Sequence, residues 1–310
     1  MGPGTRRIGV VGQSRDPSLV RVARTLDELA EPRGLELYPE PDLADLFPNA
    51  AGALVPGRLD LLVTLGGDGT LLRGARLVAA HHTPVLGVNL GHLGFLTSIQ
   101  PDALESSLEA FSAGEHWLDT RSTLEARVVT RDGATSAEYM ALNDAVLHKG
   151  GFARVIQLAV FVGEAREEVG TYAADGLILS TPTGSTAYSL SAGGAIVAPS
   201  MECVLATPIC PHTLAVRPLI LPAEMRVEVE IRNPNAEVVL TVDGQEGEAL
   251  VNGDRLVVSR GTATVPLIRF EGQSFFSTLR RKLHWGPGGP RGEASTPPVE
   301  STAIDDPTGY

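Results

Sequence analysis

The chain has 310 residues, of which 43% are hydrophobic, and a formal net charge of −12 at pH 7. This length leaves room for two domains and a sizeable core, and the apolar fraction is normal for a soluble globular protein. The acidic balance argues against a nucleic-acid-binding protein, which usually carries a basic face, but a small nucleotide ligand depends only on local groups and is still allowed.

Strand and helix signals alternate over the first part of the chain. This alternation predicts a parallel sheet with helices on its faces, and we therefore predict an α/β domain over residues 1–120. The predicted elements are, in chain order, a strand at 8–11, a helix at 19–29, a strand at 59–65, a helix at 71–80, a strand at 84–89 and a helix at 103–111.

The pattern changes near Thr120, where apolar and polar residues begin to alternate at period two and turn clusters intervene. We predict an antiparallel, sandwich-like all-β domain over residues 121–273. A last helix at 274–285 would return to complete the first domain. The segment 286–310 is rich in Gly, Pro, Ser and Thr, and we predict that it is disordered.

The most informative loop is Gly66-Gly67-Asp68-Gly69-Thr70, which joins a predicted strand to a predicted helix. Its three glycines let a phosphate approach the backbone, and the N–H groups at the helix start favour an anion. The Asp68 carboxylate opposes phosphate binding unless it holds a metal or accepts a proton. The loop therefore predicts phosphoryl transfer with a built-in base. It is not a Walker A loop, because the Gly-Lys-Ser/Thr ending is missing.

Four further clusters stand out, and each also has an ordinary structural interpretation. The glycine-rich segment 87–96 follows a predicted strand, where open α/β sheets bind ligands, but it also fits a plain loop. Asn143 and Asp144 interrupt an apolar strand and fit either a ligand site or a bulge. The run 175–194 is dense in hydroxyls, with Ser185 as a predicted helix N-cap, and fits either nucleoside binding or capping. Asp243-Gly244 is a hairpin signal.

Metal, disulfide and membrane features are weak in this sequence. The histidines are scattered and lack cysteine partners, so no zinc site is predicted. Two cysteines, Cys203 and Cys210, are too few for a disulfide framework and favour a reducing compartment. No signal peptide or membrane-spanning run is apparent, and we expect a cytoplasmic protein without membrane or nucleic-acid partners.

In their order along the chain, these clusters resemble the NAD kinase family. The similarity extends from Arg7 to Trp285, and the run 175–194 is its most specific part. The matching segments are Gly66 to Thr70, Gly87 to Phe95, Leu142-Asn143-Asp144, Asp175 to Gly194, Asp243-Gly244-Gln245 and Phe275 to Leu283.

The resemblance implies transfer of the γ-phosphoryl group of ATP, or of polyphosphate in some members, to the 2′-hydroxyl of the adenosine ribose of NAD. Asp68 would be the general base on that hydroxyl. Mg²⁺ or Mn²⁺ would neutralise the phosphates, with no protein ligand assigned to it. The phosphate loop would consist of Gly66, Gly67, Gly69 and Thr70.

The resemblance also implies the residues that bind NAD. Arg73 would face a phosphate, Phe95 would wall the adenosine pocket, and Asp175 would meet the nicotinamide end. The full implied set is Asp68, Gly69, Arg73, Phe95, Asn143, Asp144, Arg154, Asp175, Thr186, Ala187, Tyr188, Ser189, Leu190, Ser191 and Gln245.

Two positions depart from the family pattern. Many members have an arginine where this chain has Ala173, and many have a glutamate where it has Asp144. The family also forms dimers and tetramers through its β domain, with sites that borrow residues from a neighbouring subunit. A homodimer or homotetramer is therefore expected.

Two alternatives share parts of this pattern. A lipid kinase of the diacylglycerol or sphingosine type has a similar glycine-aspartate loop, but the hydroxyl-rich run 181–191 argues against a lipid cleft, and no basic amphipathic segment offers membrane docking. A non-catalytic NAD or NADP sensor on the same fold is the other alternative, and the presence of Asp68 argues against it.

Overall fold

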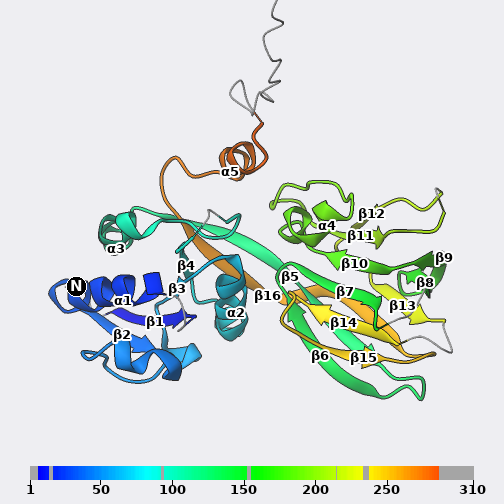
Figure 1. Ribbon diagram of the computed structural model, residues 1–310, viewed down its shortest axis with the longest axis horizontal. Helices are drawn as coiled ribbons and strands as arrows, with labels where there is room; N and C mark the ends of the chain where they lie inside the picture. Colours follow the sequence, from blue (N-terminus) through cyan, green and yellow to red (C-terminus); the bar gives the residue numbers. More distant parts are fainter. Residues whose placement is uncertain are drawn as a thin grey trace, which may run out of the picture.

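The structure is a computed structural model that describes residues 6–13, 17–91, 94–151, 155–213, 215–232 and 237–285. Figure 1 shows the N-terminal elements on one side and the β-rich part on the other. The helices are α1 (Pro17–Ala30), α2 (Asp68–Val78), α3 (Leu104–Ala113), α4 (Tyr188–Ser191) and α5 (Phe275–Lys282). The strands are β1 (Arg6–Gly12), β2 (Leu35–Pro39), β3 (Leu61–Leu65), β4 (Val85–Val88), β5 (Trp117–Val129), β6 (Thr135–Ala141), β7 (Asp144–Lys149), β8 (Ile156–Val162), β9 (Glu167–Ala174), β10 (Gly176–Ser180), β11 (Cys203–Ile209), β12 (Leu219–Pro222), β13 (Val227–Ile231), β14 (Val238–Val242), β15 (Glu246–Leu250) and β16 (Arg255–Arg269).

The N-terminal part is a parallel sheet covered by helices on both faces. Its strands lie in the order β2-β1-β3-β4, and every residue of β3 is buried, as expected for a strand packed on two sides. Val10 packs in a cluster with residues of α1 and α3, whereas the next residue, Val11, packs in a cluster with α2. The prediction of an α/β arrangement is confirmed.

The C-terminal part is an antiparallel sandwich. One sheet has the order β12-β11-β10-β7-β14-β15, and it packs on strands of the longer sheet, including β8, β13 and β16. The shared core is aliphatic and includes Leu147, Leu158, Leu179, Leu240 and Leu256. Period-two alternation in these strands produced that core, because it directs every second side chain inward.

Two long strands connect these parts into one sheet. β16 pairs with β5 along most of its length, and its end pairs in parallel with β4 through Leu267 and Val85. The change of sequence character at Thr120 therefore falls inside β5, so it marks no linker between two separate units. The last residues of β16 belong to the N-terminal sheet, which the sequence pattern did not reveal.

Helix α5 follows β16 and lies against the loop after β4. Ser274 caps its start by accepting the backbone N–H of Ser277. Gln273 donates to the carbonyl of Ser98 at 2.7 Å, and the Lys282 ammonium lies 5.6 Å from the centre of the Phe95 ring. Helix α5 begins one residue later and ends three residues earlier than the predicted range 274–285, and it contacts the Phe95 loop.

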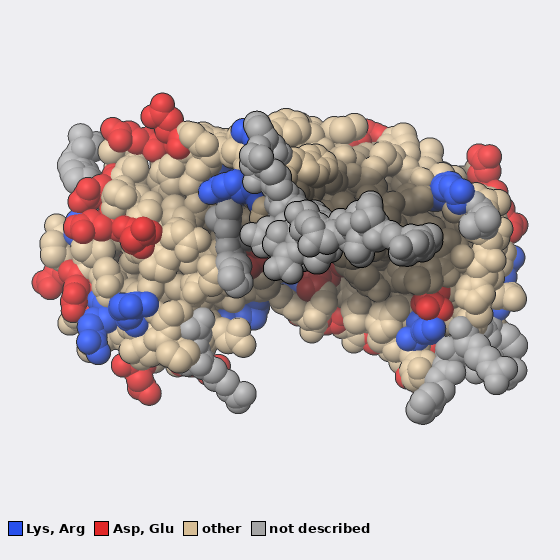
Figure 2. All heavy atoms as spheres, turned by 45° about the horizontal axis from the view of Figure 1, so that its top comes forward, with Lys and Arg blue, Asp and Glu red and all other residues tan. Residues whose placement is uncertain are grey.

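Charged side chains of both signs are interspersed on the face shown in Figure 2, with acidic groups prominent over the N-terminal part. Within the described ranges, no helix is long and apolar enough to cross a membrane. The predicted disordered segment 286–310 lies outside the described residues.

Candidate active site

Asp68 is the first residue of α2 and its carboxylate faces the loop after β4. Oδ2 accepts the backbone N–H of Phe95 at 2.7 Å, and Oδ1 accepts those of Leu96 and Thr97 at 3.1 and 3.2 Å. An ionised carboxylate offers about two acceptor sites on each oxygen. Both sites of Oδ1 are used, so the remaining site belongs to Oδ2. The carboxylate is held rigidly and still has one oxygen able to accept a proton.

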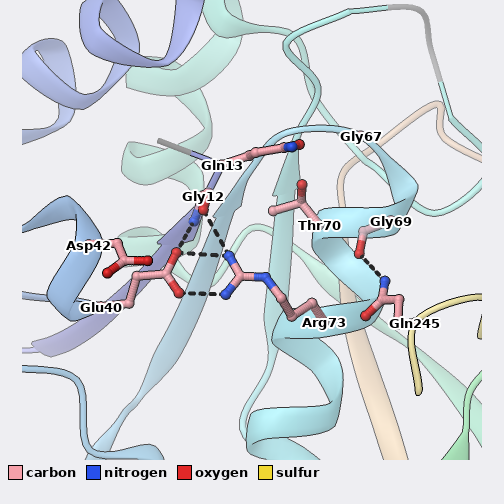
Figure 3. A pocket seen from close by; sticks show the side chains of 9 residues that line it. All are labelled: Gly12, Gln13, Glu40, Asp42, Gly67, Gly69, Thr70, Arg73 and Gln245. Carbon is pink, nitrogen blue, oxygen red and sulfur yellow. Dashed lines mark hydrogen bonds and ion pairs between the residues drawn. The ribbon is translucent and has the colours of Figure 1, made fainter. Parts of the chain in front are cut away.

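A pocket of about 610 Å³ opens beside the loop 66–70 at the start of α2. Gly67, Gly69, Thr70 and Arg73, which were assigned to the phosphates from the sequence, line it together with Gln245. Figure 3 shows that four further lining residues come from β1 and the segment after β2: Gly12, Gln13, Glu40 and Asp42.

Glu40 was not predicted from the sequence, and it fixes the position of the Arg73 guanidinium in the pocket. Its two carboxylate oxygens accept from Arg73 Nη1 and Nη2 at 2.6 and 2.8 Å, and Arg73 also donates to the carbonyl of Gly12 (Figure 3). This pairing raises the pKa of Arg73. Glu40 directly follows β2, at the edge where parallel sheets bind ligands. The alternation of buried and less buried residues over 35–39 is typical of a strand, and this strand would have placed Glu40 at the ligand-binding edge.

The two parts of the molecule meet through the Asp243 hairpin. Gln245 donates to the carbonyl of Gly69 at 2.7 Å. The buried Asp243 carboxylate accepts three successive backbone N–H groups, those of Leu142, Asn143 and Asp144. The hairpin signal was therefore correct, and the same turn also fixes the predicted Asn143-Asp144 segment relative to the phosphate loop.

Asp144 lies next to Asp243 in this buried region. Burial, followed by repulsion from the Asp243 carboxylate, raises the pKa of Asp144 to about 7. Burial likewise raises the pKa of Asp243, although its three backbone donors and Arg76 oppose the shift. A protonated Asp144 carboxyl has one O–H donor and keeps acceptor capacity, so it suits a neighbouring hydroxyl, which can accept as well as donate.

The hydroxyl-rich run packs directly on Asn143, but several of its hydroxyls are used internally. Thr181 donates to the carbonyl of Leu142 at 2.6 Å. Ser185 donates to the carbonyl of Pro182 and accepts from Val197, so its predicted N-cap role is wrong. Ser189 is fully buried and pairs with Thr207 at 2.9 Å. The accessible members of the predicted set are Thr186, Ala187, Tyr188, Leu190 and Ser191.

One predicted residue is not brought to this cluster. Asp175 pairs with Lys149 at 2.9 Å and precedes β10, whereas Asp144 pairs with Ser180 at the other end of that strand. The strand separates Asp175 from Asp144 by about 17 Å. Arg154 lies outside the described residues.

The donor set around the pocket suits a metal ion that is bound jointly with a phosphate. Among the described residues, no group of three or more His, Cys, Asp or Glu side chains is placed to hold a metal by itself. Mg²⁺ commonly takes one or two carboxylates and completes its shell with substrate phosphates and water. Asp42 and Thr70 offer such oxygen atoms in the pocket.

The chain is similar to known proteins over most of its length. Residues 8–116 match the family model "ATP-NAD kinase N-terminal domain", and residues 142–270 match "ATP-NAD kinase C-terminal domain". An NAD kinase of Gemmatimonas aurantiaca is 45% identical over 280 residues, which cover 90% of this chain and 96% of that protein. An NAD kinase of Syntrophotalea carbinolica is 44% identical over 285 residues, which cover 91% and 99%.

Two solved structures share the fold. A yeast NADH kinase complexed with NADH superposes with a TM-score of 0.83 at 28% identity, covering 93% of this chain and 89% of that one. An NAD kinase from Archaeoglobus fulgidus in complex with ATP gives 0.67 at 26% identity, covering 90% and 98%. These relatives do not support the lipid kinase alternative.

Proposed function

The chain belongs to the NAD kinase family and is a phosphotransferase that phosphorylates NAD, and we propose that it moves the γ-phosphoryl group of ATP to the 2′-hydroxyl of the adenosine ribose. The observation that supports this reaction most directly is the Asp68 carboxylate. It is held by the loop after β4 with an acceptor site left on Oδ2, and the next residue, Gly69, meets the β-rich part through Gln245.

Asp68 acts as the general base. A secondary alcohol is a poor nucleophile, and a positioned carboxylate removes its proton as the new P–O bond forms. The proton goes to Oδ2, and the ribose oxygen takes the phosphoryl group as the donor's bridging oxygen leaves with its electron pair. The three backbone donors on the carboxylate keep it aligned for this step.

ATP lies with its phosphates in the pocket beside Gly67, Gly69 and Thr70. Arg73 faces the phosphates of ATP once part of its ion pair with Glu40 is broken. Asp42 and Thr70 would help to hold a divalent ion together with the donor phosphates, and that ion would neutralise charge on them. The family model's name and the ATP complex of the archaeal relative support ATP as the donor.

NAD lies across the β-rich part. Asn143, Asp144 and the accessible residues Thr186 to Tyr188 hold the adenosine, and Phe95 forms the wall of its pocket. Asp175 faces away from this cluster within one chain. We infer that it serves the nicotinamide end of a site shared with a second copy, in a dimer or tetramer. This assembly and the cytoplasmic location stay predictions.

The Asp68→Asn variant tests the base. Turnover of NAD with ATP and Mg²⁺ should fall by at least about 10²-fold, within the usual contribution of a general base, while NAD still binds in a titration. Asp60→Asn is the matched control, because Asp60 is exposed and pairs with Arg7. Near-normal turnover of Asp68→Asn would remove Asp68 from this role, and binding without any turnover of the native chain would indicate a sensor.

A further inference from the structure

Arg269, the last residue of β16, lies under the loop that holds Asp68. Its Nη1 donates to the carbonyl of Leu96 at 3.0 Å and to the Ser98 hydroxyl at 3.1 Å. The carbonyls of Phe95 and Thr97 each lie 3.5 Å from its guanidinium. Arg269 is 8% exposed, so water competes little for these bonds.

The same peptide segment is therefore bound from two sides. Asp68 accepts the N–H groups of residues 95 to 97, and Arg269 donates to the carbonyls of residues 95 to 97. The peptide groups lie between an anion on their N–H side and a cation on their C=O side. Both charges favour the same orientation of these peptide groups, because a peptide dipole has its negative end at the oxygen and its positive end at the hydrogen.

A second set of contacts fixes Arg269. Asp119 Oδ2 accepts from Arg269 Nε at 3.2 Å and from Arg121 Nη2 at 2.6 Å. Arg121 in turn donates to the Thr183 hydroxyl at 3.2 Å, inside the hydroxyl-rich run. Arg121 and Thr183 are each 4% exposed. A continuous chain of polar contacts, buried at Thr183, Arg121 and Arg269 and half-buried at Asp119, thus leads from the hydroxyl-rich run to the loop that binds Asp68.

The charges of the side chains in this contact network balance only when Asp68 is included. Arg121 and Arg269 carry two positive charges, and Asp119 supplies one negative charge between them. Burial, and then the Arg121 cation, lower the pKa of Arg269, whereas Asp119 and Asp68 oppose that shift. Unpaired buried charges are costly, so the nearby Asp68 carboxylate helps to hold the Arg269 guanidinium in this position.

We propose that Arg269 is a positioning residue for the phosphoryl transfer, which holds the 95–98 loop and through it the Asp68 carboxylate, and that Asp119 and Arg121 tie this arrangement to Thr183. The proposal rests on the role of Asp68 as base given above. A base that is displaced by about 1 Å loses on the order of 10²-fold in rate, so the support of the loop has a direct kinetic consequence.

The experiment compares Arg269→Gln with Arg260→Gln. Both arginines are on β16, but Arg260 is exposed and pairs with Glu202. Arg269→Gln should lower kcat by about 10- to 100-fold, as is usual for residues that orient a functional side chain, and leave the KM for NAD within about twofold. Arg260→Gln should change neither. Arg269→Lys should restore only part of kcat, because an ammonium lacks the planar fork.

A double mutant separates positioning from general support of the fold. If Arg269 acts through Asp68, adding Arg269→Gln to Asp68→Asn should cost less than about twofold in the residual turnover. A full additive loss, or a loss confined to the KM for NAD, would overturn the proposal and leave the base intact. Near-normal turnover of Asp68→Asn alone would instead refute the base.

A folding control keeps the test decisive. The melting transition of each variant is measured first. If Arg269→Gln shows no cooperative transition, Asp119→Asn replaces it, because this change removes the carboxylate that orients Arg269 and keeps the side-chain volume. The same loss of kcat and the same lack of additivity with Asp68→Asn are then required.

Discussion

Gly94 lies directly against the Asp68 carboxylate. A Cβ atom built at residue 94 would come well within 3.0 Å of Oδ1, a separation that real Cβ atoms do not show. The neighbouring groups cannot yield easily, because the backbone N–H groups that follow Gly94 are the ones that bind Asp68. Glycine is therefore required here by space, and its freedom of φ plays no part.

The Gly94→Ala variant should lose turnover by about 10²-fold or more, since either Asp68 or the loop must move. Gly91→Ala is the matched control in the same loop, because a Cβ there would have no atom within 4 Å. Steady-state kinetics of both variants, with melting curves to verify folding, test this. Equal losses in the two variants would show that the close approach to Asp68 is unimportant.

Asp144 should make stability depend on pH. Its pKa is about 7 in the folded chain and near 3.9 in an unfolded one, so the folded state retains the proton more tightly. The resulting stabilisation is fully present below about pH 4 and is lost as the pH rises to about 7. Asp144→Asn cannot ionise and escapes this loss.

The melting temperature of Asp144→Asn relative to the native chain should accordingly be higher at pH 8 than at pH 5. Asp60→Asn, at an exposed site, should show the same difference at both pH values. A constant offset for Asp144→Asn across this range would contradict the raised pKa.

Glu40 should weaken donor binding, because it occupies both terminal nitrogens of Arg73. In Glu40→Gln the guanidinium keeps its charge but loses its carboxylate partner, so an incoming phosphate competes with a weaker acceptor. A charge-assisted hydrogen bond contributes about 1.5–3 kcal/mol, and only part of this is recovered. The KM for ATP should fall about two- to tenfold.

Kinetics at a fixed, saturating concentration of NAD measure this effect, and Arg73→Gln provides the opposite test, with a KM for ATP that rises. An unchanged or higher KM for ATP in Glu40→Gln would show that Glu40 supports donor binding rather than opposing it.

Local chemistry in the sequence predicted the elements and several of the loops. The run at β3 is apolar apart from Thr64, and all five of its residues are buried, as expected for a strand covered on both faces. The turn at Asp243-Gly244 was readable because both residues adopt positive φ, which Asp and Gly tolerate. The order of the glycine and hydroxyl clusters was enough to suggest the family and the central place of Asp68.

The contacts that make these clusters into a site depend on tertiary structure. Arg269 and Leu96 are 173 residues apart, and Gln245 and Gly69 are 176 apart. The first pair depends on the pairing of β16 with β4 and β5, and the second on the pairing of β14 with β7 and β15. Period-two patterns do not specify which strands become neighbours. The sequence alone determined that a carboxylate follows a glycine turn. Only the folded sheet decided that the C-terminal end of β16 lies beneath the loop holding that carboxylate, because long-range strand pairing brings them together.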